Sequence, residues 1–325
     1  MRCFGRRTEI VEPPRRGRGG NRDGADEPND SYHRERYNVV LLASRVGWLA
    51  QGWSRSRGRR SRARGPVRIR YRGQISILNN AVSSNPAAVV IAPTQYVALG
   101  KPIDEAAKKL KIIAIDSAVD SKALTSFLTT DNEQAGRIAA DILAERIQKT
   151  YADAEGDVAL ITSLPGVASL DQRAKGFKEQ LAAKYGALSI VAEKFADGQA
   201  STGRKIMTEI IAASPELRGV FASNLIMAQG AAQAVAESKT NKTGDKINLI
   251  GFDSDDQLVK FLQDGTIAAL VVQDPFRMGY DSVETALAAS KGEQVPATVD
   301  IGANVVTKAN INSARSQELL NPKIK

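Results

Sequence analysis

The sequence predicts an α/β fold made of two doubly wound, parallel-sheet lobes, the first of them incomplete at its N-terminal end. From residue 74 onward, short apolar runs of strand length alternate with helical patterns of 11–18 residues. This alternation is typical of right-handed βαβ units whose parallel sheet is covered on both faces. About ten such elements exceed one five-stranded sheet, so we expect two sheets.

The expected elements follow from hydrophobic periodicity, taken in chain order. Helical spacing of apolar residues predicts helices over Gln74–Ser84 and Ile103–Leu110, and a long helix from Asn132 through Lys149 that Asp131 and Asn132 can cap. Solid apolar runs predict strands at Ala87–Pro93, Ile112–Ile115, Val158–Thr162, Leu188–Ala192, Gly219–Ala222, Leu249–Phe252 and Leu270–Val272.

Charge divides the chain near residue 73. Residues 1–72 contain 19 arginines, no lysine and 7 acidic residues, a net charge of +12. Residues 73–325 contain 7 arginines, 19 lysines and 29 acidic residues, a net charge of −3. One evolved fold rarely switches its cation so completely, because surface Lys and Arg are largely exchangeable. The positive total of +9 comes from the first 72 residues, so we expect no nucleic-acid partner for residues 74–325. Function should be inferred from residues 74–325.

Cysteine and histidine are confined to the N-terminal segment, at Cys3 and His33. Beyond residue 73 the sequence therefore has no Cys/His zinc site, no Cys or His nucleophile–base pair and no disulfide framework. No loop has the acidic spacing of a carboxylate metal site, and no window approaches the ~18 apolar residues of a membrane span. We expect no catalytic residues, no metal and no cofactor.

Residues 1–73 form an Arg-rich segment that is expected to be disordered or out of frame. Three interpretations stand: translation of GC-rich DNA in a wrong frame, a disordered tail, or a basic arm that binds nucleic acid with Trp48 and Trp53 stacking on bases. No apolar h-region follows the basic start, so no signal peptide is recognisable. The apolar run Val39–Leu42 and the alternating stretch Val67–Arg72 have the pattern of sheet-edge strands.

Polar side chains follow the expected strands, at the edge where sheets of this kind bind ligands. They are Thr94-Gln95, Asp116-Ser117, Ser163, Asn224, Asp253-Ser254-Asp255 and Gln273-Asp274. Carboxylates accept from hydroxyls and amides both donate and accept, so the set suits a neutral polyhydroxylated ligand. Each residue alone has a plainer interpretation, because strand-end Asp and Asn commonly cap the next helix. Together they favour a binding cleft over an active site.

Several longer motifs extend this interpretation. They are Asn85–Thr94, Thr130-Asp131-Asn132 with Ala135-Gly136, Gly176-Phe177, Gly219–Asn224, Leu249–Asp253 and Val272–Pro275. With them, residues 74–325 resemble the type I periplasmic solute-binding proteins of ABC sugar importers, of the ribose-binding kind. The resemblance implies a periplasmic location and two lobes joined by three hinge crossings. It puts the first lobe at 74–129 plus 275–299 and the second at 130–274 plus 300–325.

The candidate ligand-binding set is Asp116, Arg173, Asn224, Asp253 and Gln273. The resemblance implies Asp116, Asn224, Asp253 and Gln273 by matching position, and Arg173 is included because it lies near the position of a family arginine. Two departures from the ribose pattern concern arginines. Ser117 stands where the family has an arginine after the strand-end aspartate, and Asp171 stands where the second lobe has its sugar-binding arginine, two residues before Arg173. Another pentose, a hexose or a polyol is therefore as well supported as ribose.

The first lobe is expected to be incomplete because nothing in the Arg-rich segment matches its start. The family begins this lobe with a strand, a loop whose aromatics sandwich the sugar, a helix and a second strand, roughly over residues 10–70. In the 2-1-3-4-5 strand order, the missing first strand would leave Ala87–Pro93 with an unpaired apolar edge. The chain as encoded is therefore expected to be defective, with weak or absent sugar binding.

The expected function is that of the substrate-binding component of an ABC-type sugar importer. It would be a monomer that closes over a monosaccharide or polyol and presents it to the membrane permease subunits. The alternative of a sugar-modifying enzyme is not favoured, because the sequence shows no catalytic constellation. The alternative is the core of a LacI-like, ligand-responsive transcription regulator, which shares the two-lobed architecture. Such a regulator needs an N-terminal helix-turn-helix, and the first 72 residues lack its apolar pattern.

Overall fold

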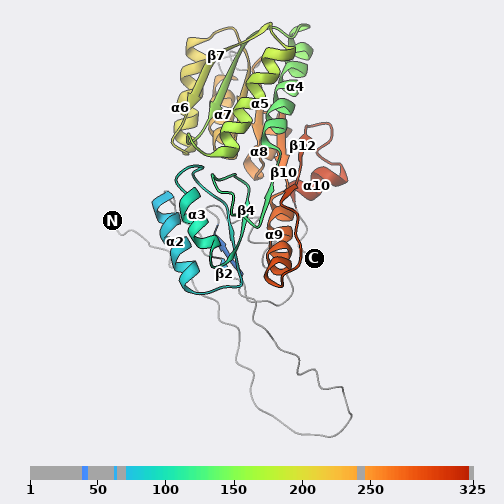
Figure 1. Cartoon of the computed structure of the whole chain (residues 1–325). Coiled ribbons are helices and arrows are strands. Elements are labelled where there is room, and N and C mark those ends of the chain that lie inside the picture. The colour runs from blue at the N-terminus through green and yellow to red at the C-terminus, as the bar shows by residue number, and fades with distance from the viewer. Residues whose placement is uncertain (1–38, 43–61, 64–70, 240–245, 322–325) are drawn as a thin grey trace, which may run out of the picture. The chain divides into compact units, whose positions relative to one another are not determined.

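The computed structural model describes residues 39–42, 62–63, 71–239 and 246–321, which all belong to the unit 36–325. Within them the chain forms two six-stranded sheets that alternate with helices (Figure 1). Each sheet contributes to two separate apolar cores, one on either face. The expected class, an α/β fold of two doubly wound lobes, is confirmed.

The first sheet is parallel throughout and has the strand order β11-β5-β4-β3-β1-β2. Its strands are β1 (Val39–Leu42), β2 (Arg62–Ala63), β3 (Ala88–Ile91), β4 (Lys111–Ile115), β5 (Ser126–Thr129) and β11 (Thr298–Asp300). The helices that accompany it are α2 (Tyr71–Ser83), α3 (Gly100–Ala107) and α9 (Pro275–Ser290). Helix α9 comes late in the chain but packs on β3 and β4.

Alternating residues of β3 show why this sheet needs helices on both faces. Val89 packs in one core with Leu78 of α2 and Ile103 of α3. Val90 points to the opposite face and packs with Met278 of α9. Because successive strand side chains point to opposite faces, a strand that is apolar throughout can be buried only between two layers. Figure 1 shows α2 and α3 on one side of the strands and α9 on the other.

The N-terminal part of this sheet differs from the expectation. The apolar run Val39–Leu42 forms β1, which pairs in parallel with β3, Val40 lying opposite Val89. The edge of β3 is therefore paired, and the prediction of an unpaired edge is wrong. Strand β2 pairs with the other side of β1, so β1 is internal and not an edge strand. The predicted strand Val67–Arg72 is also wrong at its end, where Tyr71 and Arg72 begin α2; residues 67–70 lie outside the described residues.

The second sheet has the order β12-β10-β9-β8-β6-β7 and is parallel except for β12, which runs antiparallel to β10. Its strands are β6 (Gly156–Thr162), β7 (Leu188–Phe195), β8 (Leu217–Ala222), β9 (Asn248–Phe252), β10 (Ala269–Gln273) and β12 (Ala303–Val306). Its helices are α4 (Asn132–Tyr151), α5 (Ala168–Lys184), α6 (Ala200–Ala213), α7 (Leu225–Lys239), α8 (Asp256–Gln263) and α10 (Ala314–Leu320).

Helices α4 and α5 share one face of the second sheet and approach each other unusually closely. A Cβ atom on Gly136 would lie 2.2 Å from the carbonyl oxygen of Arg173, and one on Gly176 would lie 2.0 Å from that of Glu133. Only glycine permits such contact between helix backbones. The two glycine motifs of the sequence therefore set the crossing of these helices, which brings the start of α4 beside Arg173.

The chain passes between the two sheets at three places in the described residues. It crosses from β5 to α4, from β10 to α9 and from β11 to β12. Hydrogen bonds tie the crossings to one another. The Thr130 hydroxyl donates to the Gln273 side-chain oxygen at 3.0 Å, and the Asp131 N–H donates to the Asp300 carboxylate at 3.0 Å. We call these three hydrogen-bonded crossings the hinge.

Candidate functional site

The five candidate residues lie on both sheets, at the ends of strands or at the start of a helix. Asp116 directly follows β4 of the first sheet. Asn224 follows β8 after one residue, Asp253 directly follows β9, and Gln273 ends β10, all in the second sheet. Arg173 lies in the second turn of α5. These are carboxyl ends of parallel strands, the edge at which open α/β sheets bind ligands.

Asp116 and Asp253 have the same local geometry in the two lobes. Their φ angles are 66° and 67°, in the left-handed region that side chains other than Asn and Asp rarely adopt. The N–H of Asp116 donates to Leu128 of β5 at 3.0 Å, and that of Asp253 donates to Val271 of β10 at 2.9 Å. Each aspartate thus ends its strand held by the neighbouring strand, in a conformation that is costly unless the surroundings enforce it.

Gln273 connects Asp253 to the hinge. Its side-chain nitrogen donates to Asp253 Oδ1 at 2.7 Å, and its side-chain oxygen accepts from the Thr130 hydroxyl at 3.0 Å. Gln273 is only 8% exposed, so both ends of the amide have protein partners inside the fold. Gln273 therefore links the Asp253 carboxylate to the Thr130 crossing through two hydrogen bonds.

Arg173 is buried, at 2% exposure, and its contacts fix its position. Its Nε donates to Asn132 Oδ1 at 2.8 Å, and one terminal nitrogen donates to the carbonyl oxygen of Ser223 at 3.0 Å. Its guanidinium carbon lies 3.6 Å from the centre of the Phe252 ring, a cation–π contact. The close crossing of α4 and α5 produces this arrangement, because Asn132 is the first residue of α4.

Asn224 lies between β8 and α7 and next to Asp253. Its side-chain oxygen accepts from the Met227 N–H at 3.0 Å, so it caps α7. The Leu225 N–H lies 3.4 Å from Asp253 Oδ2 and donates to it. The plainer interpretation of a strand-end asparagine, helix capping, therefore holds for its oxygen. Its amide nitrogen makes no hydrogen bond to any of the residues that the structure describes.

The charged groups of the two lobes influence one another. Burial raises the pKa of the Asp116 carboxyl; the Arg173 guanidinium acts in the opposite direction, and the negative charge of Asp253 adds to the increase. Burial lowers the pKa of Arg173, while Asp253 and Asp116 both oppose that decrease. Asp116, Arg173 and Asp253 therefore influence one another electrostatically, although they come from separate lobes. Gln273 and Asn224 adjoin this group through Asp253.

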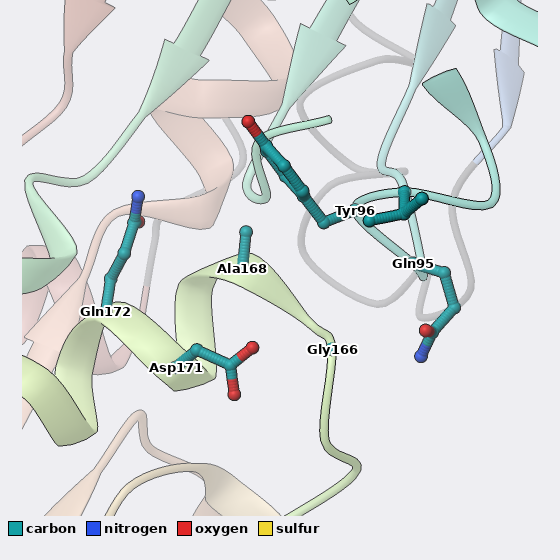
Figure 2. Close-up of a pocket in the computed structure, with 7 residues that line it drawn as sticks. Gln95, Tyr96, Gly166, Ala168, Asp171 and Gln172 are labelled. Atoms are coloured by element: carbon teal, nitrogen blue, oxygen red, sulfur yellow. The ribbon is translucent and has the colours of Figure 1, made fainter. Parts of the chain in front are cut away.

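A pocket of about 380 Å³ opens between the β3–α3 loop of the first lobe and the start of α5 in the second. Its lining residues are Gln95, Tyr96, Val97, Gly166, Ala168, Asp171 and Gln172. Figure 2 shows Ala168, Asp171 and Gln172 on the helix, opposite the loop that carries Gln95 and Tyr96. Burial raises the pKa of Asp171 against a hydrogen bond from the Gly166 backbone. Asp171 thus stands at this pocket, apart from the charged group around Asp253.

Sequence reasoning missed several residues that build the site. Asn132 and Thr130 orient Arg173 and Gln273, yet the sequence marks them as a motif at a helix start and does not indicate these contacts. Tyr96 lines the pocket but sits in an irregular loop without periodicity. Ser169 pairs with Ser117 across 52 positions of sequence, a contact that no local pattern indicates.

Among residues 71–239 and 246–321, with the two short N-terminal strands, no group of three or more His, Cys, Asp and Glu side chains could hold a metal ion. In the same part of the chain, no helix is long and apolar enough to cross a membrane.

The two sheets, the three crossings and the polar strand ends define a two-lobed solute-binding protein, the class that serves ABC-type sugar importers. The chain belongs to the periplasmic binding protein domain family, whose profile matches residues 59–294. The match begins before residue 74, so the expectation that residues 1–73 lie wholly outside the family is wrong for the last part of that segment.

Known relatives agree with this membership. The ribose import binding protein of Escherichia coli is 30% identical over 224 residues, which are 68% of this chain and 71% of that protein. A carbohydrate transporter solute-binding protein of Agrobacterium radiobacter, solved in complex with D-arabinose, is 52% identical with a TM-score of 0.85. The likeness covers 89% of this chain and all of that one. An Agrobacterium vitis solute-binding protein with bound D-fucose is 29% identical, with a TM-score of 0.79, over 87% and 99% of the two chains.

Proposed function

We propose that the protein binds a monosaccharide between its lobes and delivers it to the permease subunits of an ABC importer in the periplasm. The observation that supports the proposal is the placement of Asp116, Asn224, Asp253 and Gln273 at carboxyl ends of strands in the two sheets, with the Ser117–Ser169 hydrogen bond joining the lobes beside Asp116. Carboxylates and amides in fixed positions accept from and donate to sugar hydroxyls, and no covalent step is needed. We expect a monomer and no chemical change of the sugar.

The ligand supported best is an aldopentose of the arabinose type. The Agrobacterium radiobacter protein solved with D-arabinose is 52% identical to this chain, over 89% of this chain and all of that one. Ser117 and Asp171 replace the two arginines that the ribose pattern would place here. The lobe boundaries expected from the sequence, 74–129 plus 275–299 and 130–274 plus 300–325, are part of this proposal, with β1 and β2 added to the first lobe.

Within the proposed site the residues have different tasks. Asp116, Asn224 and Asp253 are proposed to contact sugar hydroxyls, because each is half-buried at a strand end. Gln273 and Arg173 are buried, and most of their polar atoms have protein partners. We propose that the remaining polar atoms of these two side chains contact the sugar, and that their main task is to hold the two aspartates in position. The pocket beside Tyr96 and Asp171 would be the entrance to the same cleft.

Calorimetric titration of the full chain tests the proposal. D-Arabinose, D-ribose, D-allose and D-fucose should each be added to the protein, followed by analysis of the recovered sugar for chemical change. We expect one site per chain, which binds D-arabinose more tightly than the other three sugars. The dissociation constant should lie above the low-micromolar range, because the aromatic loop of the family has no match in the Arg-rich segment. Saturable binding of none of these sugars, or recovery of an altered sugar, would contradict the proposal.

A further inference from the structure

Helix α5 begins without a cap of its own. Its N-cap residue, Val167, is apolar and offers no side-chain oxygen. The helices that begin with Asp or Ser caps in this protein are α4, α8, α9 and α10. The first N–H groups of a helix have no partner within the helix and are normally capped by a side chain or by water. The start of α5 therefore requires an acceptor from elsewhere.

The acceptor comes from the other lobe. The Ser117 hydroxyl oxygen lies 3.3 Å from the backbone N–H of Ser169, the second residue of α5, and accepts from it. The two serine hydroxyls are also 2.6 Å apart and share a hydrogen bond. Ser117 is 1% exposed and Ser169 is 3% exposed, so water reaches neither. We call this contact the interlobe cap.

The turn at the end of β4 places Ser117 for this contact. With Asp116 at a φ of 66°, the Ser117 N–H donates back to the carbonyl oxygen of Ile115 at 2.8 Å, a three-residue turn. A second hydrogen bond joins the lobes nearby: the Tyr96 N–H donates to the Gly166 carbonyl at 3.0 Å, one residue before Val167. The start of α5 is thus held by two segments of the first lobe.

We infer that Ser117 caps α5 only when the lobes close, and so sets the affinity for the sugar without touching it. This rests on the proposed function. A contact made in the closed form alone favours closure, and closure is the state that holds the ligand. Ser117 stands where the ribose pattern has an arginine. Here its side chain would act on the equilibrium between open and closed lobes.

The test compares Ser117→Ala with Ser313→Ala in the full chain. Ser313 caps α10 within its own lobe, accepting from the Ser316 N–H at 3.2 Å, so that cap exists whether the lobes are open or closed. Ser117→Ala should raise the dissociation constant for D-arabinose about two- to tenfold, the factor expected for one helix N-cap. The change should lie in faster dissociation, with the melting temperature of the sugar-free protein unchanged.

Ser313→Ala should instead lower the melting temperature equally with and without sugar and leave the dissociation constant unchanged. An unchanged dissociation constant in Ser117→Ala, or a melting temperature lowered equally in both states, would overturn the inference.

A second experiment traps the contact covalently, because oxidation captures molecules that close only transiently without sugar. In a Cys3→Ser background, the double variant Ser117→Cys with Ser169→Cys should form a disulfide under mild oxidation, because the Ser117 and Ser169 hydroxyl oxygens are 2.6 Å apart. Absence of that disulfide by mass spectrometry would overturn the interlobe cap itself. If the disulfide forms but wild-type protein does not bind D-arabinose, the proposed sugar is wrong and the cap stands.

Discussion

At the scale of single residues, Asp253 is a proposed sugar contact whose carboxylate is already held by hydrogen bonds from the protein. It accepts from Gln273 and from the Leu225 N–H, and its φ of 67° suits Asp or Asn. Asp253→Asn keeps the shape and the backbone conformation but removes the charge. Since hydrogen bonds to charged groups contribute about 1.5–3 kcal/mol, we expect the dissociation constant for D-arabinose to rise roughly tenfold or more by calorimetry.

The control for Asp253→Asn is its own stability. Circular dichroism melting should place the sugar-free variant close to wild type, because Asn retains an acceptor for Gln273. Unchanged sugar affinity in a folded variant would remove Asp253 from the site.

Asp116 gives a pH prediction of definite sign. Burial raises its pKa in the folded protein, so the folded state holds this proton more tightly than the unfolded chain. The contribution of Asp116 to the free energy of unfolding is therefore greatest below the ordinary aspartate pKa of about 3.9 and decreases as pH rises through the folded value. At pH 7 its charge destabilises the sugar-free protein.

Asp116→Asn removes that charge and tolerates the positive φ. We expect a higher melting temperature than wild type at pH 7 without sugar, a smaller difference at pH 4, and weaker sugar binding. A variant less stable than wild type at pH 7 would show that the electrostatic balance with Arg173 has the opposite sign.

At the scale of elements, the contact between α4 and α5 depends on glycine. A Cβ on Gly176 would lie 2.0 Å from the Glu133 carbonyl oxygen, so Gly176→Ala must force the helices apart. Overpacking of this kind costs about 1–3 kcal/mol or more. We expect a lower denaturant midpoint, and weaker sugar binding because Asn132 would leave Arg173.

Gly186→Ala is the matched control for this prediction, because a Cβ there meets nothing within 4 Å. Its denaturant midpoint should stay near that of wild type. Equal effects of the two substitutions would mean that close helix approach is not what Gly176 provides.

Most strands and helices after residue 74 could be predicted because their burial is two-sided or periodic. Strand β3 is buried at every position, and its apolar run was sufficient to find it. Strand β5 was missed because its four residues alternate between buried and half-buried and contain Ser and Thr. Strands β11 and β12 are three and four residues long; β11 is mostly exposed and β12 is half-buried except for Val306, so no apolar run marks them.

The site was predictable only in part, for a physical reason. Asp116, Asn224, Asp253 and Gln273 end apolar strands or follow them within two residues, so topology alone places each at the carboxyl edge of its sheet. Their role as sugar contacts stays a prediction. The Ser117–Ser169 pair and the position of Arg173 depend on how helices and lobes meet, which no local pattern encodes.

At the scale of the whole molecule, β1 tests whether the Arg-rich segment takes part in the fold. Val40 lies between Val89 of β3 and Arg62 of β2. Val40→Pro removes a backbone donor from an internal strand, where proline is not tolerated. Leaving a buried backbone partner unsatisfied costs about 1–3 kcal/mol. The melting temperature should therefore fall by several degrees.

Val40→Ala, which keeps the backbone donor, is the control and should lower the melting temperature less. If both variants melt like wild type, the pairing of β1 with β3 does not stabilise the first lobe.

The central claim is that residues from both lobes form one sugar site. Its most direct test is calorimetric titration of the full chain with D-arabinose, for wild type and for Asp116→Asn and Asp253→Asn side by side. We predict one site in wild type, with a dissociation constant above the low-micromolar range. Each variant should bind more weakly than wild type, although Asp116 and Asp253 belong to different lobes. Binding that only one of the two substitutions weakens would contradict a site shared between the lobes.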